Sequence, residues 1–226
     1  MSTLRVKQKE KRISAILAAA GEEFRSVGFN EAKVEAIAAR AEVAPATIYN
    51  YFGDKAALLL EILREHSKET RTVVAAIAFN PPDNPLQAID RFFAAVFTES
   101  MRGLSRELWC EAYAASYTAP TASLGGIVAE LDAELFDEMR RLFGNLQERG
   151  TLGDAISASD LAELGLAIGN QQWSRFLTGQ VDLEGARAEA IRQIRIFLDG
   201  AAGRPMSSNS RPDKTTKLTT SKNKGN

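Results

Sequence analysis

Residues 33–58, KVEAIAARAEVAPATIYNYFGDKAAL, have the pattern of two short helices joined by a tight turn and followed by the start of a longer helix. Val34 and Ile37 begin an apolar stripe with helical spacing. Pro45 suits the first position of the second helix, where an N–H group is not needed, and Ile48 is its inward-facing residue. Two helices joined by a three- to four-residue turn form the helix-turn-helix unit, whose second helix fits the major groove of DNA.

The second helix carries hydroxyl, amide and small side chains on the face that its apolar residues leave exposed. Hydroxyl and ammonium groups near a helix N-terminus suit phosphate oxygens, so we expect phosphate contacts from Thr47, Tyr49, Tyr51 and Lys55. Asn50 has the amide that pairs with an adenine edge. Small residues beside it suit thymine methyl groups: Ala44, Pro45 and Ala46. The alternative interpretation is a helical hairpin with surface tyrosines and no ligand.

This stretch, together with the helix before it, resembles the N-terminal domain of TetR-family transcriptional regulators. The family pattern is a helix ending in F-x-x-x-G-F/Y, then V-x-x-I-A-x-x-A-x-V, then T-[IL]-Y-x-[HY]-F-x-x-K-x-x-L. The matching residues are Phe24, Gly28, Phe29, Val34, Ile37, Ala38, Ala41, Val43, Thr47, Ile48, Tyr49, Tyr51, Phe52, Lys55 and Leu58. The resemblance is specific over residues 10–65. It implies an all-α fold in which the last two helices form a four-helix dimer interface between subunits.

The chain departs from the family pattern at four positions of this stretch, one of which is Ala46, where glycine is frequent. Glu42 stands where glycine is common, and a left-handed conformation there would cost about 1 kcal/mol. Ala32 and Ala44 stand where threonine and serine are frequent, which weakens capping and removes possible phosphate contacts. These departures affect the expected DNA contacts but not the class of protein.

Charge is distributed unevenly along the chain, although the net charge is only −1. Residues 1–65 have ten Lys and Arg against nine Asp and Glu, whereas residues 66–202 have twelve against nineteen. Residues 203–226 have six basic residues and one acidic residue. The positive charge of the first segment gathers at its start, in Arg5, Lys7, Lys9, Lys11 and Arg12. A basic end on an acidic body fits a protein that presents that end to nucleic acid, although a solvated terminus would look the same.

Helical periodicity continues through the rest of the chain, and no segment alternates as a strand does. We expect helices over residues 8–27, 33–40, 45–51, 54–78, 86–100, 105–117, 121–148, 158–177 and 183–198. Residues 1–8 are expected to form a loose basic arm. Residues 203–226 lack apolar residues for a core and should be disordered. The predicted organisation is a DNA-binding head over 1–53, a linker helix over 54–80, a ligand-binding and dimerisation domain over 81–202, and a disordered basic tail.

Bulky aromatic residues in the second half of the chain fall on helices that should face one another. By the family resemblance, some of them line an effector cavity, with a few polar groups that orient the ligand. The candidates are Phe97, Met101, Trp109, Glu111, Tyr113, Tyr117, Phe136, Phe143, Asn170, Gln171, Trp173 and Phe176. For any single aromatic residue, plain core packing is the competing interpretation.

Other functional classes lack their sequence signatures here. The chain has one histidine, His66, and one cysteine, Cys110, so we predict no transition-metal site, no internal disulfide and no cofactor. No nucleophile motif, phosphate loop or dinucleotide fingerprint is present, so we predict that the chain is not an enzyme. The sequence has no secretory signal and no apolar run of membrane-spanning length, so we expect a cytoplasmic protein that does not bind a membrane.

The sequence therefore predicts a homodimeric, sequence-specific DNA-binding regulator. We interpret it as a repressor that a small apolar or aromatic ligand releases from a palindromic operator. The alternative is a coactivator of the same fold that binds a protein partner instead of DNA, which Ala32 and Ala44 favour slightly.

Overall fold

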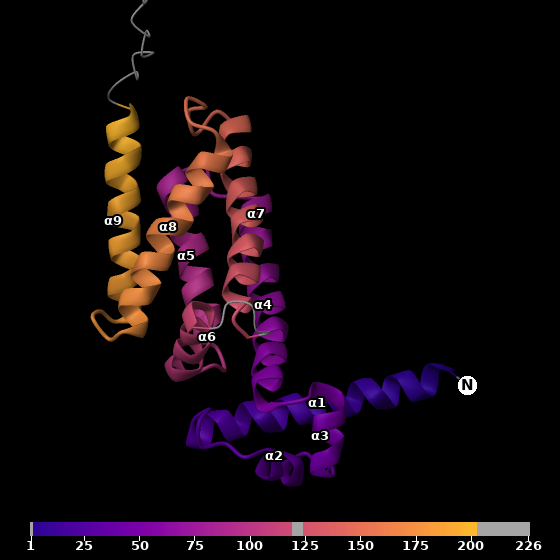
Figure 1. The fold of residues 1–226 in the computed structure, drawn as a ribbon. Helices are drawn as coiled ribbons and strands as arrows, with labels where there is room; N and C mark the ends of the chain where they lie inside the picture. Colours follow the sequence, from indigo (N-terminus) through magenta and orange to yellow (C-terminus); the bar gives the residue numbers. More distant parts are fainter. Residues whose placement is uncertain (1, 119–123, 203–226) are drawn as a thin grey trace, which may run out of the picture.

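The structure, a computed structural model, describes residues 2–118 and 124–202 of the 226-residue chain, and these residues form nine α-helices and no strand (Figure 1). The helices are α1 (Ser2–Val27), α2 (Val34–Arg40), α3 (Pro45–Phe52), α4 (Lys55–Phe79), α5 (Pro85–Met101), α6 (Arg106–Thr118), α7 (Ile127–Glu148), α8 (Ala158–Leu177) and α9 (Leu183–Ala202). The predicted fold class is confirmed. The predicted tail over 203–226 lies outside the described residues.

Two expected boundaries were wrong. The arm expected over residues 1–8 belongs to α1, which is helical from Ser2 onward. Its first two turns contain no glycine or proline and are rich in Leu, Arg, Lys and Gln, all of which favour helix. The helix expected over 121–148 begins only at Ile127, because Gly125 and Gly126 lie in a turn before it. Residues 121–123 of that prediction lie outside the described residues.

Helix α4 joins two groups of helices (Figure 1). Helices α1, α2 and α3, here called the head, pack at its N-terminal end. Helices α5 to α9, here called the body, pack along the rest of it, with α7 and α5 directly against α4. Helix α8 packs between α7 and α9, and α9 lies at the outer edge of the body. The chain passes from head to body through α4.

The head is held by an apolar core that the short helices could not form alone. The side chains of Ile16, Phe24, Ile37 and Ile48 are at most 1% exposed. Gly28, directly after α1, has a positive φ of 82°, a conformation that glycine adopts without strain. Asp54 caps α4, since its carboxylate accepts a hydrogen bond of 2.8 Å from the Ala57 N–H. These contacts fix α3 against α4.

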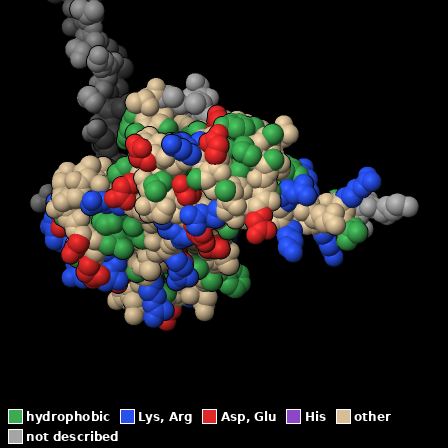
Figure 2. Space-filling view, turned by 90° about the horizontal axis from the view of Figure 1, so that it is seen from below, with side chains coloured by type: hydrophobic (Ala, Val, Ile, Leu, Met, Phe, Trp, Pro, Cys, Tyr) green, Lys and Arg blue, Asp and Glu red, His purple; other side chains and the backbone are tan. Residues whose placement is uncertain are grey.

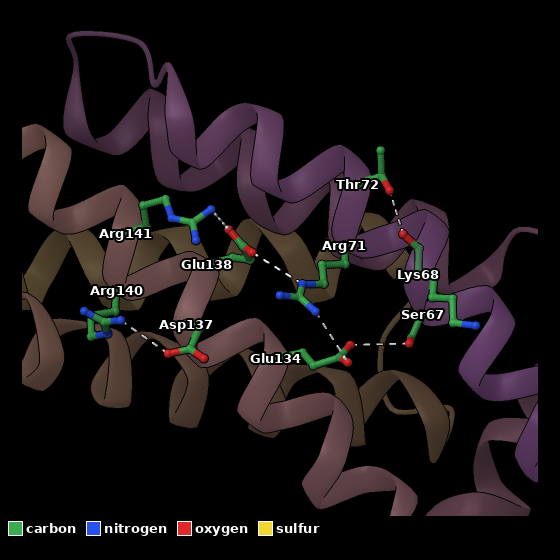
Figure 3. Close-up of polar contacts among 9 residues, drawn as sticks. All are labelled: Ser67, Lys68, Arg71, Thr72, Glu134, Asp137, Glu138, Arg140 and Arg141. Atoms are coloured by element: carbon green, nitrogen blue, oxygen red, sulfur yellow. Dashed lines mark hydrogen bonds and ion pairs between the residues drawn. The ribbon is translucent and has the colours of Figure 1, made fainter.

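The contact between α4 and α7 contains a network of ion pairs (Figure 3). Arg71 of α4 lies 3.5 Å from Glu138 and 3.8 Å from Glu134, both on α7. Glu138 is only 2% exposed and also pairs with Arg141 at 2.9 Å. A buried carboxylate destabilises a fold unless it is paired, so the two arginines compensate the burial of Glu138.

Candidate DNA-binding surface and effector cavity

Helix α3 presents the expected recognition surface at the base of the head. Because Ile48 is completely buried, the opposite side of this eight-residue helix faces outward. Tyr49 is 48% exposed and Asn50 is exposed beside it. Thr47 and Tyr51 are half-buried, which leaves part of each side chain accessible. The small residues at the start of the helix are all exposed: Ala44, Pro45 and Ala46. The surface offers hydroxyl, amide and methyl groups but no long cationic side chain.

The turn before α3 contains a residue in the left-handed conformation. Glu42 has a φ of 55°, the only positive value at a non-glycine residue in the described chain. The turn is closed by a hydrogen bond of 2.9 Å from the Val43 N–H to the Ala38 carbonyl. Ala44 precedes α3 without a side-chain cap, as expected from its missing hydroxyl. The turn thus holds α3 in place at some conformational cost.

Lys55, which we expected to contact phosphate, binds backbone carbonyl groups within the head. Its Nζ donates hydrogen bonds to the carbonyls of Phe29 at 2.6 Å, Asn30 at 2.9 Å and Ala32 at 3.1 Å. It also lies 4.7 Å from the centroid of the Phe29 ring. An ammonium group has three hydrogens, and all three have partners here. Lys55 therefore ties the turn between α1 and α2 to the start of α4.

Basic side chains lie next to the recognition helix on the first turns of α1. Arg5, Lys7, Lys9, Lys11 and Arg12 are all exposed. Figure 2, which shows the molecule from the side of the head, shows Lys and Arg side chains along the projecting end of this helix. The Nζ atom of Lys9 lies 5.9 Å from the centroid of the Tyr51 ring. Arg5 and Lys7, which were expected on a loose arm, are thus on the same helix as Lys9, the residue that approaches α3.

A partly open cavity of about 60 Å³ lies between α4 and the body and is lined by residues of α4, α5, α6, α7 and α8. Five of the twelve expected pocket residues line it: Phe97, Trp109, Tyr113, Asn170 and Trp173. The cavity is therefore in the part of the fold that the sequence indicated, although most of its wall comes from other residues.

The other seven expected pocket residues do not line this cavity. Tyr117 is 83% exposed and Gln171 is exposed, because both lie on the outer sides of their helices. Glu111 faces the head, and Phe176 packs behind Trp173 with ring centroids 5.3 Å apart. The remaining three pack against or within the apolar core elsewhere: Met101, Phe136 and Phe143.

Eleven lining residues were not predicted from the sequence, and most of them lie on α4 and α7. The missed lining residues are His66, Ser67, Thr70, Arg71, Val96, Ser100, Val128, Leu131, Asp132, Glu134 and Leu135. Most of them look like the inner or solvated face of an amphipathic helix when the sequence is read alone. The signal that was available is Asp132, a carboxylate placed one residue after the inward-facing Leu131.

Several polar groups among the residues that line the cavity have hydrogen-bond partners within the protein. The Asn170 amide donates a hydrogen bond of 3.0 Å to the Asp132 carboxylate. Burial raises the pKa of Asp132, and the bond from Asn170 opposes that rise. Burial also raises the pKa of Tyr113, and the nearby charge of Asp132 adds to the rise. His66 Nε2 lies 2.6 Å from the Glu99 carbonyl, which can only accept, so this nitrogen carries the hydrogen.

Two polar contacts connect the body to the head without passing through α4. The Asn30 amide, in the turn after α1, donates a hydrogen bond of 2.8 Å to the Glu111 carboxylate on α6. Arg25, in the last turn of α1, donates to the Gly103 carbonyl at 3.4 Å. Helix α6 also supplies Trp109 and Tyr113 to the cavity wall. One helix therefore contacts both the cavity and the head.

Over the described residues, no cluster of His, Cys, Asp or Glu has the grouping that a metal ion needs. None of the helices there is both long enough and apolar enough to span a membrane.

Comparison with known proteins supports this description of the two regions. Residues 16–62 match the family described as bacterial regulatory proteins, tetR family. The chain is 27% identical over 180 residues to the HTH-type transcriptional regulator BetI of Stenotrophomonas maltophilia strain R551-3. That match covers 78% of this chain and 87% of BetI. The match therefore covers a much longer part of the chain than the family match over residues 16–62.

Solved structures show that the whole described fold recurs. The TetR-family transcriptional repressor FadR from Thermus thermophilus, solved in complex with lauroyl-CoA, has a TM-score of 0.60 and 22% identity. It covers 88% of this chain and 97% of its own. SmeT, the repressor of the Stenotrophomonas maltophilia multidrug efflux pump SmeDEF, has a TM-score of 0.63 and 16% identity. It covers 82% of this chain and 89% of its own. At these identities the likeness shows the fold alone.

Proposed function

Because this chain belongs to the TetR family of transcriptional regulators, we propose that it is a homodimeric repressor that leaves a palindromic operator when a small ligand enters the body. This proposal rests on two observations taken together. Helix α3 has an exposed recognition surface, and the cavity is lined by α4 and α6, two helices that also contact the head. We further expect it to act in the cytoplasm, where the chromosome is, and without enzymatic activity.

DNA contact is assigned to α3 and the first turns of α1. Tyr49, Thr47 and Tyr51 supply hydroxyl groups for phosphate oxygens, which fix the position of the helix without reading sequence. Asn50 supplies the base-edge contact, and the small residues before it allow close approach to thymine methyl groups. Since α3 has no long cation, much of the electrostatic attraction would come from the basic side chains of α1.

The dimer is assigned to α8 and α9. Helix α9 lies at the edge of the body, and its Ile196 is 59% exposed beside the half-buried Phe197 and Leu198. The exposed Ile196, and the exposed parts of Phe197 and Leu198, leave apolar surface on α9 that fits burial against a second copy. A two-fold dimer would place two α3 helices in successive major grooves, about 34–36 Å apart.

Ligand binding is coupled to DNA binding through the two helices that touch both regions. Helix α4 carries the head and lines the cavity, and α6 lines the cavity and holds Asn30 through Glu111. A ligand that repacks the cavity would shift both helices and change the separation of the two heads. By linkage, the ligand must bind the DNA-incompetent arrangement better by the same factor that it weakens DNA affinity.

A protein-binding coactivator of the same fold is the less favoured candidate. It would not need exposed hydroxyl groups on α3 or basic side chains beside them. Both features are present, in Tyr49 and in Lys9 near Tyr51.

The deciding experiment is a selection of bound duplexes from a random DNA pool, followed by titration of the binding against salt. We expect a palindrome and an affinity that falls steeply with salt, because basic side chains displace counterions from phosphate. Recovery of no preferred sequence by a folded, dimeric protein would overturn the repressor assignment and favour the coactivator.

A further inference from the structure

The effector cavity has an aromatic wall built around Trp173. The Trp173 ring lies 5.4 Å from Phe97 and 5.8 Å from Trp109, between ring centroids, and it is nearly perpendicular to Trp109 at 88°. The faces of aromatic rings carry negative partial charge and attract cations whose centres approach within about 6 Å. An apolar ligand would also suit such a wall, so the charge of the remaining groups decides between the two.

Asp132 places a carboxylate in this cavity without a cationic partner. Its one hydrogen bond comes from the neutral amide of Asn170, at 3.0 Å. Burial raises the pKa of the carboxyl group, which means that the surroundings disfavour its negative charge. A partly buried carboxylate with only a neutral donor is destabilising, and a cation beside it would remove that penalty.

The other charged groups around the cavity are already compensated. Arg71 lies between Glu134 and Glu138, at 3.8 and 3.5 Å, so its charge is used within the contact of α4 with α7 (Figure 3). His66 donates through Nε2 to the Glu99 carbonyl. Among the described residues that line the cavity, Asp132 is thus the carboxylate without an opposite charge, and the cavity has an excess of negative charge.

We propose that the effector of this chain is a small organic cation of the tertiary or quaternary ammonium class, held between Asp132 and the rings of Trp109 and Trp173. This inference rests on the proposed function, because it names the ligand class of the same effector cavity. The cavity of about 60 Å³ limits the bound group to a few non-hydrogen atoms without rearrangement, since one water needs about 10–15 Å³.

The two tryptophans of the chain are Trp109 and Trp173, and both line the cavity, so tryptophan fluorescence reports directly on its occupancy. The full chain is titrated with tetramethylammonium and, separately, with tert-butanol, a neutral molecule of similar shape and size. Ionic strength is kept constant with potassium chloride. We expect tetramethylammonium to bind at least tenfold more tightly, because only the cation gains from the carboxylate and the ring faces.

Two variants test the carboxylate itself. Asp132→Asn keeps the shape of the side chain and removes its charge, and it should lower the affinity for tetramethylammonium at least tenfold. It should not lower the melting temperature, because the charge that it removes is disfavoured by burial. Asp137→Asn is the matched control, since Asp137 is an exposed carboxylate on the same helix that pairs with Arg140 outside the cavity. That variant should bind tetramethylammonium as the unmodified chain does.

Equal binding of the two molecules, or unchanged affinity in Asp132→Asn, would overturn the assignment of a cation. These titrations contain no DNA, so they are independent of the operator selection. Failure here with a palindrome recovered from the pool would leave the repressor assignment standing and the ligand class wrong. Selective cation binding without a preferred DNA sequence would support the ligand class and overturn the regulatory role.

Discussion

The recognition surface of the head and the cavity of the body use opposite arrangements of polar side chains. On α3, Tyr49 and Asn50 are exposed and contribute little to the folded core. In the cavity, Asp132 and Asn170 are partly buried and bonded to each other among aromatic rings. The difference means that the DNA surface can change at little cost in stability, whereas changes in the packing around the cavity alter folding and binding together.

The largest effect is expected from Gly169, where α8 closes against α5 beside the cavity. A Cβ atom added there would lie 2.5 Å from the Phe93 ring, which is only 2% exposed. Overpacking of this kind costs about 1–3 kcal/mol, and the preference of a helix interior for alanine offsets about 1 kcal/mol of that cost, so Gly169→Ala should lower the free energy of unfolding by up to about 2 kcal/mol. Denaturant titration followed by circular dichroism measures the change.

The matched control is Gly144→Ala on α7, where an added Cβ has no neighbour within 4 Å. Alanine is favoured over glycine inside a helix by about 1 kcal/mol, so this variant should be more stable than the unmodified chain. Equal stability of the two variants would show that α8 does not pack closely on Phe93. It would also contradict the expectation that substitutions cost more stability in the body than on the surface of the head.

Lys55 is the exception within the head, because its three hydrogen bonds to carbonyls make it a structural residue. Lys55→Met keeps an unbranched side chain that is one atom shorter and removes the donor, and it should cost about 2 kcal/mol of stability. At temperatures where the variant remains folded, the dependence of DNA affinity on salt should be almost unchanged. A slope reduced by about one, with full stability, would instead make Lys55 a phosphate contact like those on α3.

A change at Tyr49 should weaken DNA binding and leave stability almost unchanged, as expected for the exposed surface of the head. Tyr49→Ala removes a hydroxyl group from α3, and we expect a loss of about tenfold in affinity for all DNA sequences, since a bond to a charged acceptor contributes about 1.5 kcal/mol. Neither the salt dependence nor the melting temperature should change much, because tyrosine is uncharged and 48% exposed.

Tyr117→Ala provides the control, since Tyr117 is a second exposed tyrosine, on α6 and away from the head surface. It should bind DNA normally. Fluorescence anisotropy with an operator duplex measures both variants. Normal DNA affinity in Tyr49→Ala would remove the hydroxyl contact from the assignment.

The sequence predicted the head well because the pattern that specifies it involves residues that are close together in the chain. The spacing of Val34, Ile37 and Ile48 specifies which sides of two short helices are buried, and the outward side follows from that. The role of Lys55 could not be predicted in this way, since its partners at Phe29, Asn30 and Ala32 lie more than twenty residues away.

The cavity was predicted less well because it depends on how five helices pack. Periodicity identifies an apolar side of α7 but not which residues at its border face a hollow rather than solvent. Asp132 and Glu134 are both on that border, and only the position of α4 and α8 distinguishes them from a solvated helix face. Tyr117 was wrongly included for the same reason, since an aromatic side chain at the exposed side of α6 has the same sequence signal as a buried one.

The smallest expected effect concerns Glu42, whose positive φ of 55° holds the turn before the recognition helix. A left-handed conformation costs a non-glycine residue about 1–2 kcal/mol, but glycine also increases the entropy of the unfolded chain. Glu42→Gly should therefore stabilise the protein by only about 0.5 kcal/mol. Because the change also removes an exposed negative charge near the DNA surface, Glu42→Gln is needed beside it. Both variants should bind DNA somewhat more tightly, but only Glu42→Gly should unfold at higher denaturant concentration. Equal stability of the two would mean that backbone strain in this turn is negligible, and that substitutions in the turn, like those on α3, have little effect on stability.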